Sequence, residues 1–311
     1  MLGSIYSAVT GHASAIPRNP QILPENASDG MRAACYASHG NPDVVQCTSR
    51  FPKPIQAPGQ VLVKVHYAAL NPVDVKFRAT SINNSVIPLP KITGADFSGE
   101  IISTSAKSEL AIGDRVMGMY PLLFSGWGSA AEYVAIDEDL LAKVPRNVSM
   151  RDAAAMPLVC TTVLQAFQSY RSSCPSLPSS VLIQAASGGV GSLAVQFCKH
   201  VLGMHVIGTC SGSNRNLVLQ LGADEVLDYT SFRDGAGLAE SLSSPADVVF
   251  DPKSYLYEQS TVNDRRILKP NVYSIYTLAG YNTITGLLYQ YCFLPQCSAN
   301  ILPRPSEPLD S

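Results

Sequence analysis

The chain has 311 residues, enough for about two domains and a sizeable core. Its net charge of −2 gives no electrostatic reason to expect nucleic acid or an anionic membrane surface as a partner. Hydrophobic residues make up 46% of the chain, but no run approaches the roughly 18 apolar residues of a membrane span.

Residues 1–30 are predicted to be an extension, with one basic residue, Arg18, and no acid before Glu25. A disordered tail and a mitochondrial transit peptide are the two interpretations, and the single basic residue favours the tail. The eight cysteines of the chain are scattered and follow no secretory signal. This pattern favours buried thiols in a reducing compartment, so we expect a cytoplasmic protein, with the mitochondrion as the alternative.

Residues 31–150 are predicted to form an irregular, β-rich barrel, because short apolar runs alternate with Gly, Pro, Asn and Asp. The first strand begins at Met31. Strict alternation in the strand Val61–Tyr67 puts one set of side chains on a single face, namely Val61, Val63, Val65 and Tyr67. The further strand candidates are Gly94–Ser103, Asp114–Met119 and Ala130–Ile136.

Residues 151–290 are assigned to a second domain of the α/β class. Residues 151–171 are predicted to be helical and to bridge the domains. Strand candidates then begin at intervals of 21 to 25 residues, near Val181, His205, Val226, Asp247 and Val272. This is the repeat of a βα unit and predicts a parallel sheet. Residues 291–311 contain several prolines and no periodicity, and are expected to form an irregular tail.

A glycine loop lies between the first strand and helix of this domain, in Val181–Leu202. Its fingerprint is Ala185-x-x-Gly188-x-x-Gly191, with alanine where many such loops have glycine. Strand, tight turn and helix N-terminus together suit a pyrophosphate. We therefore predict nucleotide binding over an ordinary turn, and we expect one α-helical face after the loop, formed by Val190, Leu193, Ala194, Phe197, Cys198, Val201 and Leu202.

The order and spacing of short motifs from Met31 to Ile275 resemble those of the medium-chain dehydrogenase/reductase superfamily, in its zinc-free quinone oxidoreductase branch. The motifs that carry the resemblance are Met31-Arg32-Ala33-Ala34, Asn71-Pro72-Val73-Asp74, Gly94–Gly99, Gly113–Val116, Ala131-Glu132-Tyr133, Pro157-Leu158 with Thr162, Ala185–Gly191 and Leu221–Asp224. The resemblance implies a GroES-like β-barrel catalytic domain plus a Rossmann dinucleotide-binding domain, with the active site in the cleft between them.

The chain departs from this family in two places. After Asp251 it has Pro252-Lys253-Ser254-Tyr255, where the family has a small residue and glycines. Little patterned sequence follows Tyr276, where the family adds closing strand–helix elements, so we expect a truncated or divergent C-terminus. The resemblance allows a homodimer paired at a sheet edge, and this C-terminus puts that pairing in question.

No metal is expected, because zinc needs three or four Cys, His or acidic ligands. No cysteine occurs between Cys47 and Cys160, and the histidines share no ligand spacing. Where zinc alcohol dehydrogenases carry catalytic Cys and His ligands, the alignment of motifs gives Asn71 and Ala95.

NADP(H) is the expected cofactor, because no acid occurs between Gly191 and Asp224 to bind a ribose 2′-hydroxyl. The glycine loop contributes Ser187, Gly188, Gly189, Val190 and Gly191. Ser211 and Arg215 suit a 2′-phosphate, although Arg215 could also be a solvated helix charge. By resemblance, Tyr229 also contacts that phosphate and Thr162 lies near the nicotinamide; a helix-interior hydroxyl is the alternative for Thr162.

The resemblance implies hydride transfer from NADPH to a quinone or an α,β-unsaturated carbonyl without zinc. The expected catalytic residues are Asn71, Asp74 and Lys76, of which Asn71 could donate a hydrogen bond to the acceptor oxygen and Lys76 could add positive charge. A structural turn with a surface ion pair is an equal alternative for Asp74 and Lys76. Two rival functions stay open: a non-catalytic NADPH-binding or redox-sensing protein, and an alcohol dehydrogenase that recruits metal.

Overall fold

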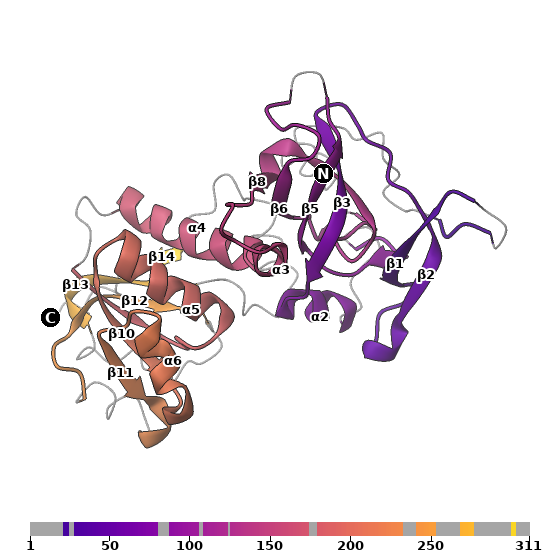
Figure 1. Cartoon of the computed structure of the whole chain (residues 1–311). Coiled ribbons are helices and arrows are strands. Elements are labelled where there is room, and N and C mark those ends of the chain that lie inside the picture. Colours follow the sequence, from indigo (N-terminus) through magenta and orange to yellow (C-terminus); the bar gives the residue numbers. More distant parts are fainter. Residues whose placement is uncertain are drawn as a thin grey trace, which may run out of the picture. The chain divides into compact units, whose positions relative to one another are not determined.

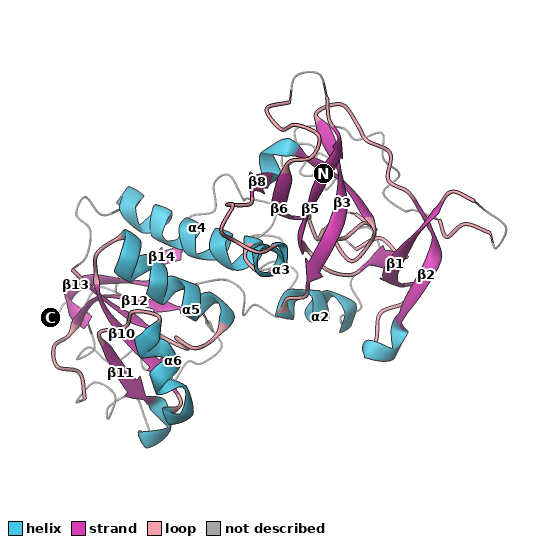
Figure 2. Cartoon of the chain, in the orientation of Figure 1, coloured by secondary structure: helices cyan, strands magenta, loops and turns pink. Residues whose placement is uncertain are grey.

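The computed structural model describes residues 21–24, 28–79, 87–105, 108–123, 125–173, 179–232, 241–252, 268–276 and 300–302. Contacts divide the chain into two compact units, and the division falls in the sequence between Leu158 and Val159 (Figure 1). The first is rich in strands, and the second alternates helices with strands (Figure 2). Most of residues 1–30, the loop after Pro252 and most of the tail 291–311 lie outside the described residues, as does the sequence on which the truncated C-terminus was predicted.

The first unit contains two antiparallel sheets. The smaller has the order β2-β1-β4, and its strands are β1 (Gly30–Tyr36), β2 (Val45–Pro52) and β4 (Lys91–Ile92). The larger has the order β7-β3-β5-β6-β8, with β3 (Gln60–Ala69), β5 (Asp96–Ser103), β6 (Arg115–Met119), β7 (Tyr133–Asp137) and β8 (Leu141–Lys143). Their inward side chains share one core, which includes Phe51, Val63, Phe97 and Trp127.

Two short helices of this unit begin with recognisable signals. Helix α2 (Pro72–Ala79) has proline at its first position, where no intrahelical donor is lost. Helix α3 (Met150–Ala154) is capped by Ser149, whose side chain accepts a hydrogen bond from the Asp152 N–H. The next helix, α4 (Pro157–Ser173), also begins with proline. These signals determine the residue at which each helix begins.

The second unit is built on a six-stranded sheet with the order β11-β10-β9-β12-β13-β14. Its parallel strands are β9 (Ser180–Ile183), β10 (His205–Cys210), β11 (Glu225–Asp228), β12 (Ala246–Asp251) and β13 (Leu268–Tyr276), and β14 (Asn300–Leu302) is antiparallel to β13. The order reverses beside β9, which is the switch point where ligands bind in doubly wound sheets.

Helices cover one face of this sheet, as Figure 1 shows for α5 (Gly189–Gln196) and α6 (Arg215–Gln220). Val181 and Ile183 of β9 face a core that also contains Val163, Ala194 and Val218 from the three helices α4, α5 and α6. Leu182 points to the opposite face, into a second cluster with Ile207 and Val249. Burial on both faces explains why the strands read as continuous apolar runs.

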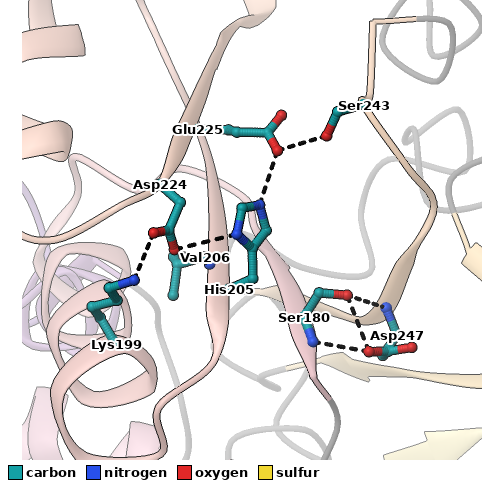
Figure 3. Close-up of polar contacts among 8 residues, drawn as sticks. All are labelled: Ser180, Lys199, His205, Val206, Asp224, Glu225, Ser243 and Asp247. Atoms are coloured by element: carbon teal, nitrogen blue, oxygen red, sulfur yellow. Dashed lines mark hydrogen bonds and ion pairs between the residues drawn. The ribbon is translucent and has the colours of Figure 1, made fainter.

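Two separate groups of polar contacts lie at the beginnings of the parallel strands, one joining β10 to β11 and the other joining β9 to β12 (Figure 3). Lys199 Nζ donates to Asp224 Oδ1 at 2.6 Å, and His205 Nε2 lies 2.9 Å from Glu225 Oε1. Asp247 accepts hydrogen bonds from the backbone N–H and the hydroxyl of Ser180. These contacts lie at the end of β10 and β11 opposite to that reached by Cys210 and Asp228, so they stabilise the sheet away from the glycine loop.

Two face assignments made from the sequence were wrong. Tyr67 is half-exposed, because an irregularity in the β3–β5 register between Val65 and Tyr67 breaks the alternation. Val201 is 68% exposed, because the predicted α-helix widens into a π-helical turn over Phe197–Val201 and shifts the phase of its last residues. Gly222, which follows the C-cap residue Leu221 of α6, has a φ of +112°, a left-handed conformation that is common just after a helix and that favours glycine.

Candidate functional site

The glycine loop makes a sharp, tightly packed turn between β9 and α5. Ala185 has a φ of +49°, in the region where glycine is usual, and its carbonyl accepts the Gly188 N–H at 2.9 Å. A Cβ on Gly191 would collide with the carbonyl oxygen of Ala185. Glycine at position 191 therefore lets the helix start against the end of the strand, while the preceding turn keeps Gly188 and Gly189 exposed.

The N-terminus of α5 presents free backbone donors at this turn. Gly188 is the N-cap residue, no side chain caps the helix, and no acidic residue occurs in its first turn. The first N–H groups of a helix lack intrahelical partners and carry its positive dipole end. The exposed turn around Gly188 and Gly189 can therefore bind a phosphate or another anion.

A second loop, after β10, is hydrogen-bonded to the glycine loop. Asn214 Nδ2 lies 3.3 Å from Ser187 Oγ and 3.2 Å from Ser211 Oγ. Thr209, at the end of β10, accepts the Ala186 N–H on its carbonyl at 2.8 Å. These bonds hold residues 185–187 and residues 209–214 together at the carboxyl ends of two neighbouring strands.

Arg215 and Tyr229 flank this second loop. Arg215 is exposed, but its Nη1 donates to the Val226 carbonyl at 2.5 Å, which directs the side chain toward β11. Tyr229 follows the last residue of β11 and is 52% exposed. The predicted cofactor residues of the second unit, apart from Thr162, thus lie in the segments that follow β9, β10 and β11. Thr162 lies in α4 and is half-buried.

Asp228, which the sequence pattern did not single out, is the last residue of β11. It pairs in register with Cys210, so it stands beside the end of β10. Hydrogen bonds from the side chain and backbone of Thr230, and from the Gly212 N–H, hold the pKa of Asp228 below its usual range. The β10 loop therefore lies beside an ionised carboxylate supplied by the next strand.

In the first unit, Asn71 is tied to a buried acid. Asn71 immediately precedes α2, and its Nδ2 donates to Asp96 Oδ2 at 2.9 Å. The other oxygen of Asp96 accepts the Leu158 N–H, in the first turn of α4, at 3.0 Å. Burial raises the pKa of Asp96 to about 7, although both hydrogen bonds favour the ionised form.

Asp74 and Lys91 are the other buried charged groups near Asn71. Asp74 Oδ2 accepts the Asn71 backbone N–H at 2.7 Å, the N3-to-N-cap bond of a capping box. Burial raises the pKa of Asp74 and lowers that of Lys91 to about 8. Lys91 Nζ donates to the carbonyls of Ser125 and Trp127, so it cross-links a neighbouring loop.

The structure brings only part of the expected catalytic trio together. Asn71 and Asp74 are hydrogen-bonded, as described above, and Asp74 serves the start of a helix. Lys76 is half-buried and follows Asp74 by two positions, a spacing at which helical side chains do not face each other. Asp96 and Asp228 were missed as site residues. Asp96 sits within the Gly94–Gly99 motif and Asp228 directly precedes Tyr229, so their neighbours could have drawn attention to them.

Within the described part of the chain, no group of three or more His, Cys, Asp or Glu side chains could hold a metal ion. The cysteines there, Cys35, Cys47, Cys160, Cys198 and Cys210, are not in disulfide bonds. No helix among the described residues is long and apolar enough to cross a membrane.

Comparison with protein families matches two segments of the chain. Residues 57–146 match the alcohol dehydrogenase GroES-like domain, and residues 189–261 match the family described as zinc-binding dehydrogenase. The first segment contains all five strands of the larger sheet of the first unit, and the second begins at α5. The expected combination of a GroES-like domain with a Rossmann-type domain is therefore confirmed.

Two plant proteins are similar to the chain over most of its length. An NADPH-dependent alkenal/one oxidoreductase of Arabidopsis thaliana chloroplasts is 37% identical over 227 residues, 71% of this chain and 57% of that protein. A chloroplast envelope quinone oxidoreductase homolog of the same plant is 34% identical over 225 residues, 70% of this chain and 67% of the relative. The chain spans just over half the length of several curated relatives it matches.

Among solved structures, the quinone oxidoreductase from Coxiella burnetii is similar in fold and sequence. It superposes with a TM-score of 0.64 and 28% sequence identity, covering 85% of this chain and 87% of the other. The similarity thus extends across both units of the chain and is not confined to the glycine loop.

Proposed function

The chain belongs to the quinone oxidoreductase branch of the medium-chain dehydrogenase/reductase superfamily, and from this premise we propose that it is an NADPH-dependent reductase of quinones or α,β-unsaturated carbonyls. The observation that carries the proposal is the hydrogen bond from Asn214 Nδ2 to Ser187 Oγ. It joins a phosphate-binding turn to a loop rich in hydroxyl and amide groups, where the ribose end of a dinucleotide would bind.

The residues around the glycine loop fit NADP(H). Gly191 provides the close backbone approach, and the free N–H groups of Val190 and its neighbours at the start of α5 would bind the pyrophosphate. Ser211, Arg215 and Tyr229 would hold the 2′-phosphate, because hydroxyl groups and a guanidinium suit a phosphate dianion. Thr162 is proposed to contact the nicotinamide. The bound cofactor supplies a hydride.

Asn71 is the residue proposed to touch the acceptor. Its Nδ2 keeps one N–H on Asp96 and has a second N–H for a carbonyl oxygen, where negative charge develops during reduction. Asp96 acts through Asn71 and is therefore a positioning residue. An ionised Asp96 requires the nitrogen end of the amide to face it, and this fixes the direction of the second donor.

Asp74 and Lys76 have different proposed roles. Because Asp74 accepts the Asn71 backbone N–H, it supports the turn that presents Asn71 and need not contact the acceptor itself. Lys76 is proposed to add positive charge near the reduced oxygen, and its half-buried position on α2 is compatible with that role.

We further propose that the reaction needs no zinc. Hydride addition to an electron-poor alkene or quinone requires a donor for the developing oxyanion, and the Asn71 amide can serve as that donor. A homodimer and a cytoplasmic location remain part of the proposal. Light scattering of the purified chain and fractionation of cells test these two points.

The proposed activity is tested by following NADPH oxidation with the purified chain after metal removal, using a phenanthrenequinone and a small enone as acceptors. Turnover with NADPH that survives a zinc chelator is the expected result. A folded protein that binds NADPH but reduces neither acceptor would instead support a non-catalytic, redox-sensing role. Activity that returns only with stoichiometric zinc would support the metal-dependent alternative.

A further inference from the structure

The loop after β10 (residues 211–214, the β10 loop) contains no acidic residue, but Asp228 at the end of β11 lies beside it. Dinucleotide-binding folds that prefer NADH place a carboxylate at the end of the second strand, where it accepts the ribose 2′-hydroxyl. Here that strand ends in Cys210, and Asp228 lies beside it in the parallel register. A Cβ built on Gly212 would lie 2.5 Å from Asp228 Oδ2, so the carboxylate touches the backbone of the loop.

We infer that Asp228 is a specificity-determining residue for the cofactor, and that its carboxylate weakens the preference for NADPH over NADH. The inference rests on the proposed function, since it concerns the same 2′-phosphate site. The carboxylate that influences cofactor choice would thus come from the end of β11, whereas the sequence pattern places such an acid at the end of β10.

The contacts of Asp228 keep its charge in place. Asp228 Oδ1 accepts both the N–H and the hydroxyl of Thr230, at 2.9 and 2.7 Å. The Gly212 N–H bonds to the carboxylate as well. This last bond uses a backbone donor of the β10 loop that would otherwise be free for a phosphate oxygen.

The charge balance of the loop follows from these contacts. Arg215 is the cation of the proposed 2′-phosphate site. Its positive charge interacts with the negative charge of Asp228, which partly neutralises it. A 2′-phosphate near both side chains would be attracted by one and repelled by the other. A ribose 2′-hydroxyl would meet no repulsion and could donate to the carboxylate, so discrimination between the two cofactors is reduced.

The test compares dissociation constants of NADPH, NADH, adenosine 2′,5′-bisphosphate and 5′-AMP for the full chain and for Asp228→Asn. Loss of one charge a few ångströms from a phosphate should strengthen binding of the two 2′-phosphorylated ligands about five-fold at low salt. The effect should shrink as ionic strength rises. Binding of NADH and 5′-AMP should stay constant or weaken. Asp228→Ser provides a second variant if the asparagine form does not fold.

Asp224→Asn is the matched control, because it removes an equal charge from the opposite end of β11, where Asp224 pairs with Lys199. It should leave the NADPH-to-NADH affinity ratio unchanged. An unchanged or lower ratio in both Asp228 variants, or an equal rise in the control, would overturn the inference while leaving NADPH binding intact. Absence of binding of all four ligands to the wild-type chain would overturn the proposed cofactor, and the inference with it.

Discussion

The side chain of Asn71 donates a 2.9 Å hydrogen bond to Asp96, a carboxyl group with no exposed surface. The same carboxyl group accepts the Leu158 N–H at the start of α4. The buried side chain of Asp96 thus holds in place both the Asn71 amide, which is proposed to contact the acceptor, and the first turn of α4.

Replacing Asp96 by Asn should reduce kcat for NADPH oxidation about ten-fold and leave the KM for NADPH unchanged. The new side chain keeps the shape but no longer demands the nitrogen end of the Asn71 amide. Steady-state kinetics of the two proteins measures the effect. A change in KM with a constant kcat would contradict the positioning role.

Asp96 should also make stability depend on pH between about 4 and 7. Its folded pKa is raised to about 7 by burial, so the folded state binds a proton that the unfolded state has released. The free energy of unfolding of the wild type, relative to Asp96→Asn, should therefore fall as pH rises through this window. Urea unfolding at several pH values measures it. Asp114→Asn is the control, because the pKa of half-buried Asp114 is lowered, mainly by a hydrogen bond from the Ala111 N–H, and its titration lies below the window.

Gly191→Ala should destabilise the chain by about 1–3 kcal/mol and weaken NADPH binding at least ten-fold, because the new methyl group meets the Ala185 carbonyl. Gly189→Ala is the matched control for folding. Its Cβ would lie 3.7 Å from Val159 Cγ1, an ordinary contact, so unfolding should be unaffected. Equal stability of the two variants would argue against the tight approach of α5 to β9.

Asp224 should stabilise the second unit at neutral pH but not in acid. Partial burial opposes its ionisation, but hydrogen bonds from Lys199 and the Val206 N–H, with the nearby charges, lower the pKa of Asp224. A lowered folded pKa gives stability that is present above about pH 4 and is lost as pH falls through the folded value. Asp224→Asn should therefore cost about 1 kcal/mol at pH 7 and nothing near pH 2. Denaturant unfolding at both pH values tests this, and a constant difference would contradict it.

Asp74→Ala separates the structural role of this residue from a catalytic one. Loss of the bond to the Asn71 N–H should cost about 1–2 kcal/mol of stability, as removal of a helix cap does. The remaining activity of the folded fraction should stay within a few-fold of the wild type. A loss of activity of a thousand-fold at full stability would mean that Asp74 itself reacts with the acceptor.

The nucleotide-binding architecture could be predicted well from the sequence. Strands β10, β11 and β12 begin within one residue of the expected positions, because strands buried on both faces must be apolar throughout. The glycine loop was recognisable for a similar reason, since only glycine at position 191 avoids the Ala185 carbonyl. Such local constraints produce recognisable residue patterns at fixed spacing in the sequence.

Other features depend on distant partners and could not be read in this way. The register change beside Tyr67 depends on the pairing of β3 with β5, and the π-helical turn before Leu202 has no sequence mark that we recognise. The pairing of Asn71 with Asp96 links positions 25 residues apart. Asp228 acquires its position beside the loop after β10 only when β10 and β11 align, so the neighbouring Tyr229 could draw attention to Asp228 but could not predict that contact.

The most direct test of the proposed reaction is deuterium transfer from NADPH labelled at C4 of the nicotinamide to a small enone. NADPH labelled on one face or the other would be incubated separately with the chain, and the product analysed by mass spectrometry. Hydride transfer by this chain should place one label, and not the other, on the β-carbon of the saturated ketone. Saturated product without deuterium from either label, or no product from a chain that binds NADPH, would contradict hydride transfer.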